Sequence, residues 1–218
     1  MAAAGAHAGP AQLQDSMAQR LVACTVCHGK EGRAAPDGFY PRIAGKPAVY
    51  LLNQLQNFRD GRRAYGPMVT LVAPLPDDYL QAIAQHFAAL DLPYASPPPV
   101  RDAPALLQRG QQLALQGDRD KQLPACSACH GAALTGVQPA TPGLLGLPRD
   151  YLVAQLGAWV TGQRRAHAPD CMAQLAQRLT GSDIAAVSAW LASQPVPSPS
   201  TAVPAKSEAA PMRCGSVP

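Results

Sequence analysis

The sequence predicts an all-α protein made of two similar helical domains joined by a short linker. The 218-residue chain contains one five-residue motif twice, apolar residues recur at helical spacing around each copy, and a proline-rich stretch separates the copies. Aromatic residues make up only 5% of the chain, whereas 23 prolines and 18 glycines are present. This composition is typical of short helices joined by long loops, with little side-chain bulk for two large cores.

The first half of the chain is predicted to hold three helices after a flexible lead over residues 1–12. Asp15-Ser16 is expected to cap the first helix, and Asp77 or Asp78 the third. The three helices are expected over the approach to Cys24, residues 50–58 and residues 77–90.

The second half repeats this pattern and ends in a tail without periodicity. Its helices are expected over residues 105–117, 151–160 and 182–193. The proline-rich linker is predicted to be extended and semi-rigid, and the tail, which is rich in Pro, Ser and Ala, to be disordered. The predicted division is a first domain over 1–95, a linker over 96–104, a second domain over 105–195 and a tail over 196–218.

The two halves are copies of one ancestral unit. Cys24 and Cys126 differ by 102 positions, and one deletion followed by a three-residue insertion brings the later residues into register. Pairs at an offset of 101 include Pro41 with Pro142, Tyr50 with Tyr151, Gln54 with Gln155 and Phe58 with Trp159. Pairs at an offset of 104 include Leu80 with Ile184 and Ile83 with Val187. The sequence therefore predicts an internal duplication.

The repeated motif is Cys-x-x-Cys-His, formed by Cys24, Cys27 and His28 and again by Cys126, Cys129 and His130. This pattern is typical of covalent haem c attachment, in which two thioethers hold the porphyrin and the histidine binds the iron. A thioredoxin-like redox pair would need strands nearby, and a zinc site would need two further ligands at short spacing. We therefore expect two covalently bound haem c groups, which would also supply the missing apolar bulk.

The duplication selects the sixth iron ligands. At the offset of 104, Met68 superposes on Met172, and both are expected in loops between the two later helices of their domain. No other potential pair of sixth ligands superposes at this offset. We therefore predict His/Met ligation at both irons, which raises the reduction potential and leaves no position for a substrate.

Net charge and hydropathy bear on whether the protein binds nucleic acid or crosses a membrane. The formal charge is +4, but the haem propionates would bring the holoprotein near neutrality, so no nucleic-acid partner is expected. No apolar run is long enough to span a bilayer, and residues 1–8 lack the features of a signal peptide. Because haem is normally attached outside the bacterial cytoplasm, we expect a periplasmic protein whose export signal is absent from this sequence.

Each half resembles a class I cytochrome c, and the tandem resembles the two-haem cytochrome c4 family over about residues 15–194. The resemblance is carried by Ala23–Gly29 with Ala125–Gly131, by Ile43–Gly45 with Leu144–Gly146, and by the Tyr50 to Gly61 segment with its copy. It implies two class I cytochrome c domains packed around a pseudo-twofold axis, with the haem propionates close together.

The resemblance also implies roles for residues around the haems. Pro41 and Pro142 would orient the proximal histidines through their carbonyl groups, unless they are ordinary loop prolines. Tyr50 and Tyr151 are within expected reach of the propionates. The same is true of Arg62, Arg63, Arg164 and Arg165, for which a solvated basic face is the alternative.

Three functions remain open on the sequence. The first is a periplasmic electron carrier, not an enzyme, that accepts electrons from a dehydrogenase or quinol-oxidising complex and passes them to a terminal oxidase or another cytochrome. The second is a two-haem enzyme, such as a thiosulfate dehydrogenase or a peroxidase. The third is the dedicated electron-accepting subunit of such an enzyme.

Cys171 departs from the family pattern, because it directly precedes the proposed ligand Met172. A thiolate on the iron would lower the reduction potential, which keeps the enzyme hypothesis open. The duplication favours Met172 as the ligand. A disulfide to Cys214, or two free thiols, are the alternatives for Cys171 off the iron.

Overall fold

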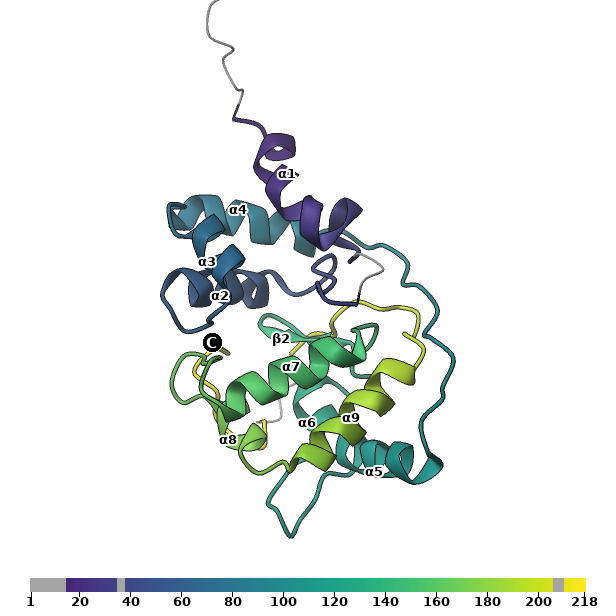
Figure 1. Cartoon of the computed structure of the whole chain (residues 1–218). Helices are drawn as coiled ribbons and strands as arrows, with labels where there is room; N and C mark the ends of the chain where they lie inside the picture. Colours follow the sequence, from purple (N-terminus) through teal and green to yellow (C-terminus); the bar gives the residue numbers. More distant parts are fainter. Residues whose placement is uncertain (1–14, 35–37, 206–209) are drawn as a thin grey trace, which may run out of the picture.

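The computed structural model describes residues 15–34, 38–205 and 210–218. The predicted flexible lead over residues 1–12 lies outside these ranges. Within the described residues, the two halves form two helical bodies, one above the other in Figure 1. No described helix is long and apolar enough to cross a membrane.

The described part of the first body has four α-helices that pack around a small apolar core. Its elements are α1 (Met17–His28), the short 3-10 helix η1 (Lys30–Gly32), α2 (Ala48–Arg59), α3 (Gly66–Val72) and α4 (Asp77–Ala88). Ser16 caps α1, as predicted, because its side chain accepts the backbone N–H of Gln19. Helix α2 packs on α3 and α4, and α1 packs on α4. Phe87 of α4 is fully buried at the centre of this body.

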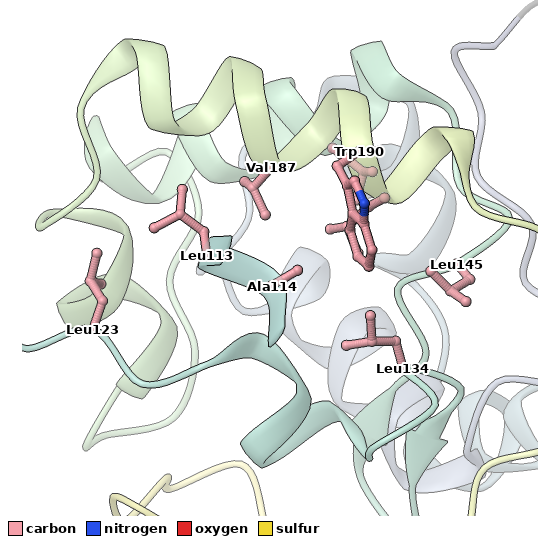
Figure 2. Close-up of a cluster of buried hydrophobic side chains, with 9 residues drawn as sticks. Leu113, Ala114, Leu123, Leu134, Leu145, Val187 and Trp190 are labelled. Carbon is pink, nitrogen blue, oxygen red and sulfur yellow. The ribbon is translucent and has the colours of Figure 1, made fainter. Parts of the chain in front are cut away.

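The second body repeats this arrangement and adds a small hairpin. Its elements are α5 (Pro104–Leu115), α6 (Cys126–His130), β1 (Gly136–Val137), β2 (Thr141–Pro142), α7 (Arg149–Val160), α8 (Cys171–Ala176) and α9 (Gly181–Ser193). The strands pair antiparallel, with Gly136 opposite Pro142. Figure 2 shows the core, in which Leu113 and Ala114 of α5 face Val187 and Trp190 of α9.

The crossing of α5 and α9 depends on one glycine. A Cβ atom at Gly110 would lie 2.6 Å from the Cβ atom of Trp190 and would also collide with the carbonyl oxygen of Ala186. The two helices therefore approach more closely than any larger residue at position 110 allows. Helix α5 in turn contacts α6, so this crossing supports the helix that carries the second motif.

Several sequence predictions need correction in detail. Met68 and Met172 lie in the first turns of the short helices α3 and α8, not in loops. Pro76, not Asp77 or Asp78, is the N-cap of α4, so its first turn is stabilised by the acidic charges alone. The second motif sits on its own five-residue helix, because the chain turns away from α5 at Gly117 before it.

The prediction of a disordered tail is wrong for the described tail residues. Its described residues form no helix, but Val203 exchanges backbone hydrogen bonds with the β1 segment, and Cys214 forms a disulfide with Cys171. The chain ends between the two bodies, where Figure 1 marks the C-terminus close to α2 and α8. Linker residues 92–103 run as an extended strand-like path along the outside, from α4 to α5 (Figure 1).

Asp183, at the start of α9, is held by a network of positive and neutral donors. Burial would raise the pKa of its carboxyl, but hydrogen bonds from Lys121, Thr180 and Arg109 hold that pKa well below the usual range. Thr180 and Asp183 also form a capping box, and Arg109 lies 2.8 Å from the carboxylate.

We predict that Asp183→Asn lowers the free energy of unfolding of the second body by about 1.5–3 kcal/mol, because a buried charge-assisted network loses its acceptor. Since the folded pKa lies below the unfolded value of about 3.9, this stabilisation is present above pH ~4 and is lost as the pH falls further. Chemical denaturation of holoprotein measures both effects. Asp120→Asn, at an exposed turn position, is the control, and equal stability of the two variants would contradict the assignment.

Candidate haem-binding sites

The two motifs face one cavity of about 940 Å³ that is lined by residues of both bodies. The lining is mainly apolar and includes Leu51, Phe87, Leu113 and Leu191. Both pairs of motif cysteines, both motif histidines, Met68 and Met172 also line it. The fold therefore brings all the predicted iron ligands and thioether positions to one connected space.

The last turns of α1 place the first motif at the cavity. Cys24, Cys27 and His28 lie within two helical turns, so the thiols and the ring share one side of the helix end. The Nδ1 atom of His28 lies 2.9 Å from the carbonyl oxygen of Pro41. Because a carbonyl oxygen only accepts, Nδ1 carries the hydrogen, and Nε2 keeps its lone pair. Burial lowers the pKa of His28, so the ring is neutral and suited to binding a metal.

The short helix α6 presents the second motif in the same way. The Nδ1 atom of His130 lies 2.7 Å from the carbonyl oxygen of Pro142, and burial lowers the pKa of this ring as well. Pro142 belongs to β2, so the hairpin that the sequence did not predict positions the carbonyl group. The two prolines thus make the same hydrogen bond at equivalent positions.

The competing interpretations of the motif find no support in this geometry. All four motif cysteines are free thiols, so neither pair forms a disulfide. Over residues 15–34, 38–205 and 210–218, no three His, Cys, Asp or Glu side chains gather as a metal site would require. Burial raises the pKa of Cys126 to about 11, which keeps the thiol neutral and is unlike the acidic cysteine of a redox pair.

Met68 and Met172 reach the cavity from α3 and α8. Met68 packs against the Phe58, Val72 and Leu80 cluster, which fixes the start of α3 in the first body. Met172 follows Cys171 directly, and Asp170 caps α8 by accepting the backbone N–H of Ala173 at 3.0 Å. A third methionine, Met212 of the tail, also lines the cavity and was not selected on the sequence.

The two bodies meet through a reciprocal contact of four side chains. Arg63 donates to Gln54 of its own body at 3.1 Å and to Gln155 of the other at 2.7 Å. Arg164 donates to Gln155 at 2.7 Å and to Gln54 at 3.0 Å. The backbone around Arg63 and Arg164 pairs antiparallel, like one rung of a sheet. The four side chains are related in pairs across the contact, as the pseudo-twofold packing implied by the family resemblance requires.

Each arginine also stacks on the aromatic ring of its own body. The guanidinium of Arg63 lies 4.2 Å from the centroid of Phe58, and that of Arg164 lies 3.8 Å from the centroid of Trp159. Both arginines are buried, so the alternative of a solvated basic face is wrong for them. Arg62 instead pairs with Asp60, and Arg165 is exposed.

Four buried cations around the cavity form no salt bridge to a carboxylate among the described residues: Arg42, Lys46, Arg63 and Arg164. The one side-chain acceptor of Lys46 within the described ranges is the carbonyl oxygen of Gly143, in the other body, at 3.0 Å. Burial lowers the pKa of Lys46 to about 8 and that of Arg63 to about 10. Buried charges are costly unless they are paired, so this cavity is built for a negatively charged occupant.

These observations test whether haem c fits the residues present, and it does. The cavity offers apolar walls for a porphyrin, free thiols for thioethers, neutral imidazoles and buried cations for propionates. The indole Nε1 of Trp159 and the Oγ of Ser216 are buried in the cavity lining without a hydrogen-bond partner, so both are available to an acceptor. Tyr50 and Tyr151 also line the cavity, and burial, then the neighbouring Tyr151, raises the pKa of Tyr50.

Sequence reasoning missed several cavity residues. Gln54 and Gln155 share the offset of 101, so the duplication could have identified them as a functional pair. Lys46 has Leu147 as its counterpart, and residues 212–217 have no counterpart at all, so no repeat signal pointed to them.

Comparison with known proteins agrees with this geometry. Residues 107–195 match the cytochrome c family. Cytochrome c4 from Thiocapsa roseopersicina is 32% identical over 193 residues, which is 86% of this chain and 96% of that protein. The chain belongs to the cytochrome c4 family. As in the two-haem members of that family, the cofactor is haem c, covalently bound at two sites, and the function is electron transfer.

Two further proteins that are similar to this cytochrome are named after thiosulfate dehydrogenase. The thiosulfate dehydrogenase electron acceptor from Thiomonas intermedia is 38% identical over 185 residues, which is 85% of this chain and 84% of that protein. The structure of a thiosulfate dehydrogenase from Marichromatium purpuratum matches with a TM-score of 0.72 and 33% identity. That match covers 82% of this chain but only 38% of the other chain.

Proposed function

We propose that this protein is a periplasmic electron acceptor that takes electrons from a thiosulfate-oxidising dehydrogenase and passes them to a terminal oxidase or another cytochrome. The observation that carries the proposal is the presence of two equivalent His/Met sets on one cavity shared by both bodies. The identity of 38% to a thiosulfate dehydrogenase electron acceptor supports the choice of donor.

The ligand roles follow from the positions of the side chains. Cys24 and Cys27 would hold the first haem and Cys126 and Cys129 the second, each through two thioethers. His28 with Met68, and His130 with Met172, would bind the two irons. A bound haem c with two protein ligands stores and releases one electron without an open position for a substrate.

The surrounding residues keep these ligands in place in both redox states. The carbonyl groups of Pro41 and Pro142 fix the ring orientation and tautomer of the two histidines. Arg63 and Arg164, held by four hydrogen bonds to Gln54 and Gln155, would bind the propionates. Because these groups are already positioned, little rearrangement accompanies electron transfer.

The enzyme hypothesis rested on Cys171 as a thiolate ligand. In the structure Cys171 is bonded to Cys214, so it is no thiolate. The donor set of the cavity therefore favours a carrier that receives electrons from a separate dehydrogenase.

Removal of either methionine tests the ligand roles. We predict that Met68→Ala and Met172→Ala each diminish the long-wavelength Met–iron charge-transfer band of the oxidised protein by about half. Each variant removes the methionine ligand of one of the two irons. Absorbance near the red edge of the visible spectrum measures this band. Met17→Ala is the control, since Met17 packs on the core of the first body away from the cavity. A full-strength band in either ligand variant would show that the assigned methionine does not bind the iron.

If a thiosulfate dehydrogenase is the donor, the protein should react with thiosulfate only when that enzyme is present. The oxidised holoprotein alone is expected to leave thiosulfate unchanged, and to become reduced when a catalytic amount of thiosulfate dehydrogenase is added. Stopped-flow absorbance of the haem bands follows the reduction, with a single-haem cytochrome c as the reference acceptor. Thiosulfate oxidation by the isolated protein would support the enzyme hypothesis, and no faster reduction than the reference would exclude this donor.

A further inference from the structure

The disulfide between Cys171 and Cys214 fastens the C-terminal segment to the helix that carries Met172. Cys171 is the first residue of α8, and Met172 is the next. The two bonded cysteines are separated by 43 positions, with Cα atoms 5.2 Å apart. The bridge therefore restrains the backbone beside the proposed ligand directly, from outside the helical body.

Further contacts fix the same segment on both sides of the cavity. The backbone N–H of Gly215 donates to the carbonyl oxygen of Pro169 at 2.9 Å, just before α8. The side-chain amide of Asn53, on α2 of the first body, donates to the carbonyl oxygen of Ser216 at 3.0 Å. Met212, Cys214, Ser216 and Val217 all line the cavity. The segment 212–217 thus crosses from one body to the other, in the gap where Figure 1 marks the C-terminus.

The first body holds its methionine by a different means. Helix α3 is packed into an apolar cluster that contains Phe58, Leu80 and Met68 itself. Residue 67, the counterpart of Cys171, is a proline at the start of α3. Each short helix buries a single residue, Val72 in α3 and Ala176 in α8, and Leu175 of α8 packs against the second core. The start of α8, unlike that of α3, is also held by a side-chain cap from Asp170 and by the disulfide. The duplication therefore allows Met172, which lies beside the disulfide, to be compared with Met68, which does not.

We propose that the Cys171–Cys214 bridge and residues 212–217 form a clasp that positions Met172 and closes the second haem site against small exogenous ligands. The proposal rests on the His130/Met172 ligation given under the proposed function. Opening the clasp frees the start of α8, so that Met172 leaves its position while Met68 keeps its own.

A dithiol opens the clasp by thiol–disulfide exchange. One thiolate of the dithiol attacks a sulfur of the bridge, which breaks the S–S bond and releases the other cysteine as a thiolate. The second thiol of the dithiol then attacks its own partner sulfur in the mixed disulfide and releases the remaining cysteine. The protein gains two electrons and two protons as the Cys171 and Cys214 thiols, and the dithiol loses them to become a cyclic disulfide. Ascorbate reduces haem iron and leaves the bridge intact, so it provides the matched reductant.

The test compares carbon monoxide binding by the full-length holoprotein after ascorbate alone and after ascorbate with dithiothreitol. Untreated protein is expected to show the Met–iron band of both haems and to bind carbon monoxide poorly. After dithiothreitol, one haem per chain is expected to bind it, and alkylation should label two additional thiols. The double variant Cys171→Ser with Cys214→Ser should reproduce this result without a dithiol and lose about half of the band in the oxidised protein.

A second pair of variants tests whether segment 212–217 positions Met172 while the Cys171–Cys214 disulfide stays intact. A Cβ atom at Gly215 would collide with the carbonyl oxygen of Ala168, so Gly215→Ala should displace the segment and weaken the band of one haem. Gly157→Ala, on α7, is the control because nothing lies within 4 Å of its added Cβ atom.

The outcomes separate this inference from the proposed function. If the untreated protein lacks the Met–iron bands, the ligation itself is wrong. If both bands are present and survive in the double serine variant, with carbon monoxide still excluded from both haems, the clasp does not position Met172. Two alkylatable thiols at Cys171 and Cys214 in the native protein would also overturn the inference.

Discussion

Two buried guanidinium groups, those of Arg63 and Arg164, are the constraint on which the rest of the structure depends. Each is removed from water, stacked on an aromatic ring and hydrogen-bonded only to neutral oxygens in the described structure. Such groups are tolerated when a negative partner compensates the lost hydration. The same two side chains join the helical bodies, so the need for an anionic cofactor and the need for a fixed interface are met at one place.

This arrangement explains why the duplicated chain remains symmetrical at its centre. Gln54 and Gln155 each accept from both arginines, and a change in one member would leave a donor unpaired in each body. The proximal histidines are fixed independently, through the Pro41 and Pro142 carbonyl groups of their own body. The symmetrical contact therefore orients the two sites relative to each other, while local contacts orient each ligand.

The parts of the fold and site that the sequence predicts are those with a periodic or repeated signal. The six longer helices, the internal duplication and the pairing of Met68 with Met172 follow from spacing. The bridge of Cys171 to Cys214 was one of several open alternatives, because sequence does not specify which thiols approach each other. The burial of Arg63 and Arg164 was left open for a related reason, since each also bonds to a glutamine of the opposite body.

Other misses concern features that one copy has and the other lacks. Lys46 donates across the interface to Gly143, where its counterpart is an apolar leucine. Among the described residues, the β1–β2 hairpin and the ordered tail occur in the second body only, and the tail contacts residues far from it in the chain. Composition suggested disorder for the tail, but a disulfide and a few backbone hydrogen bonds outweigh that tendency.

A crystal structure of the holoprotein would test the central claim most directly, by locating the haem propionates relative to the four-residue contact. The account predicts that propionate oxygens of the two haems lie within hydrogen-bond distance of the guanidinium groups of Arg63 and Arg164. Propionates directed into solvent, with both guanidinium groups still bonded only to Gln54 and Gln155, would contradict it.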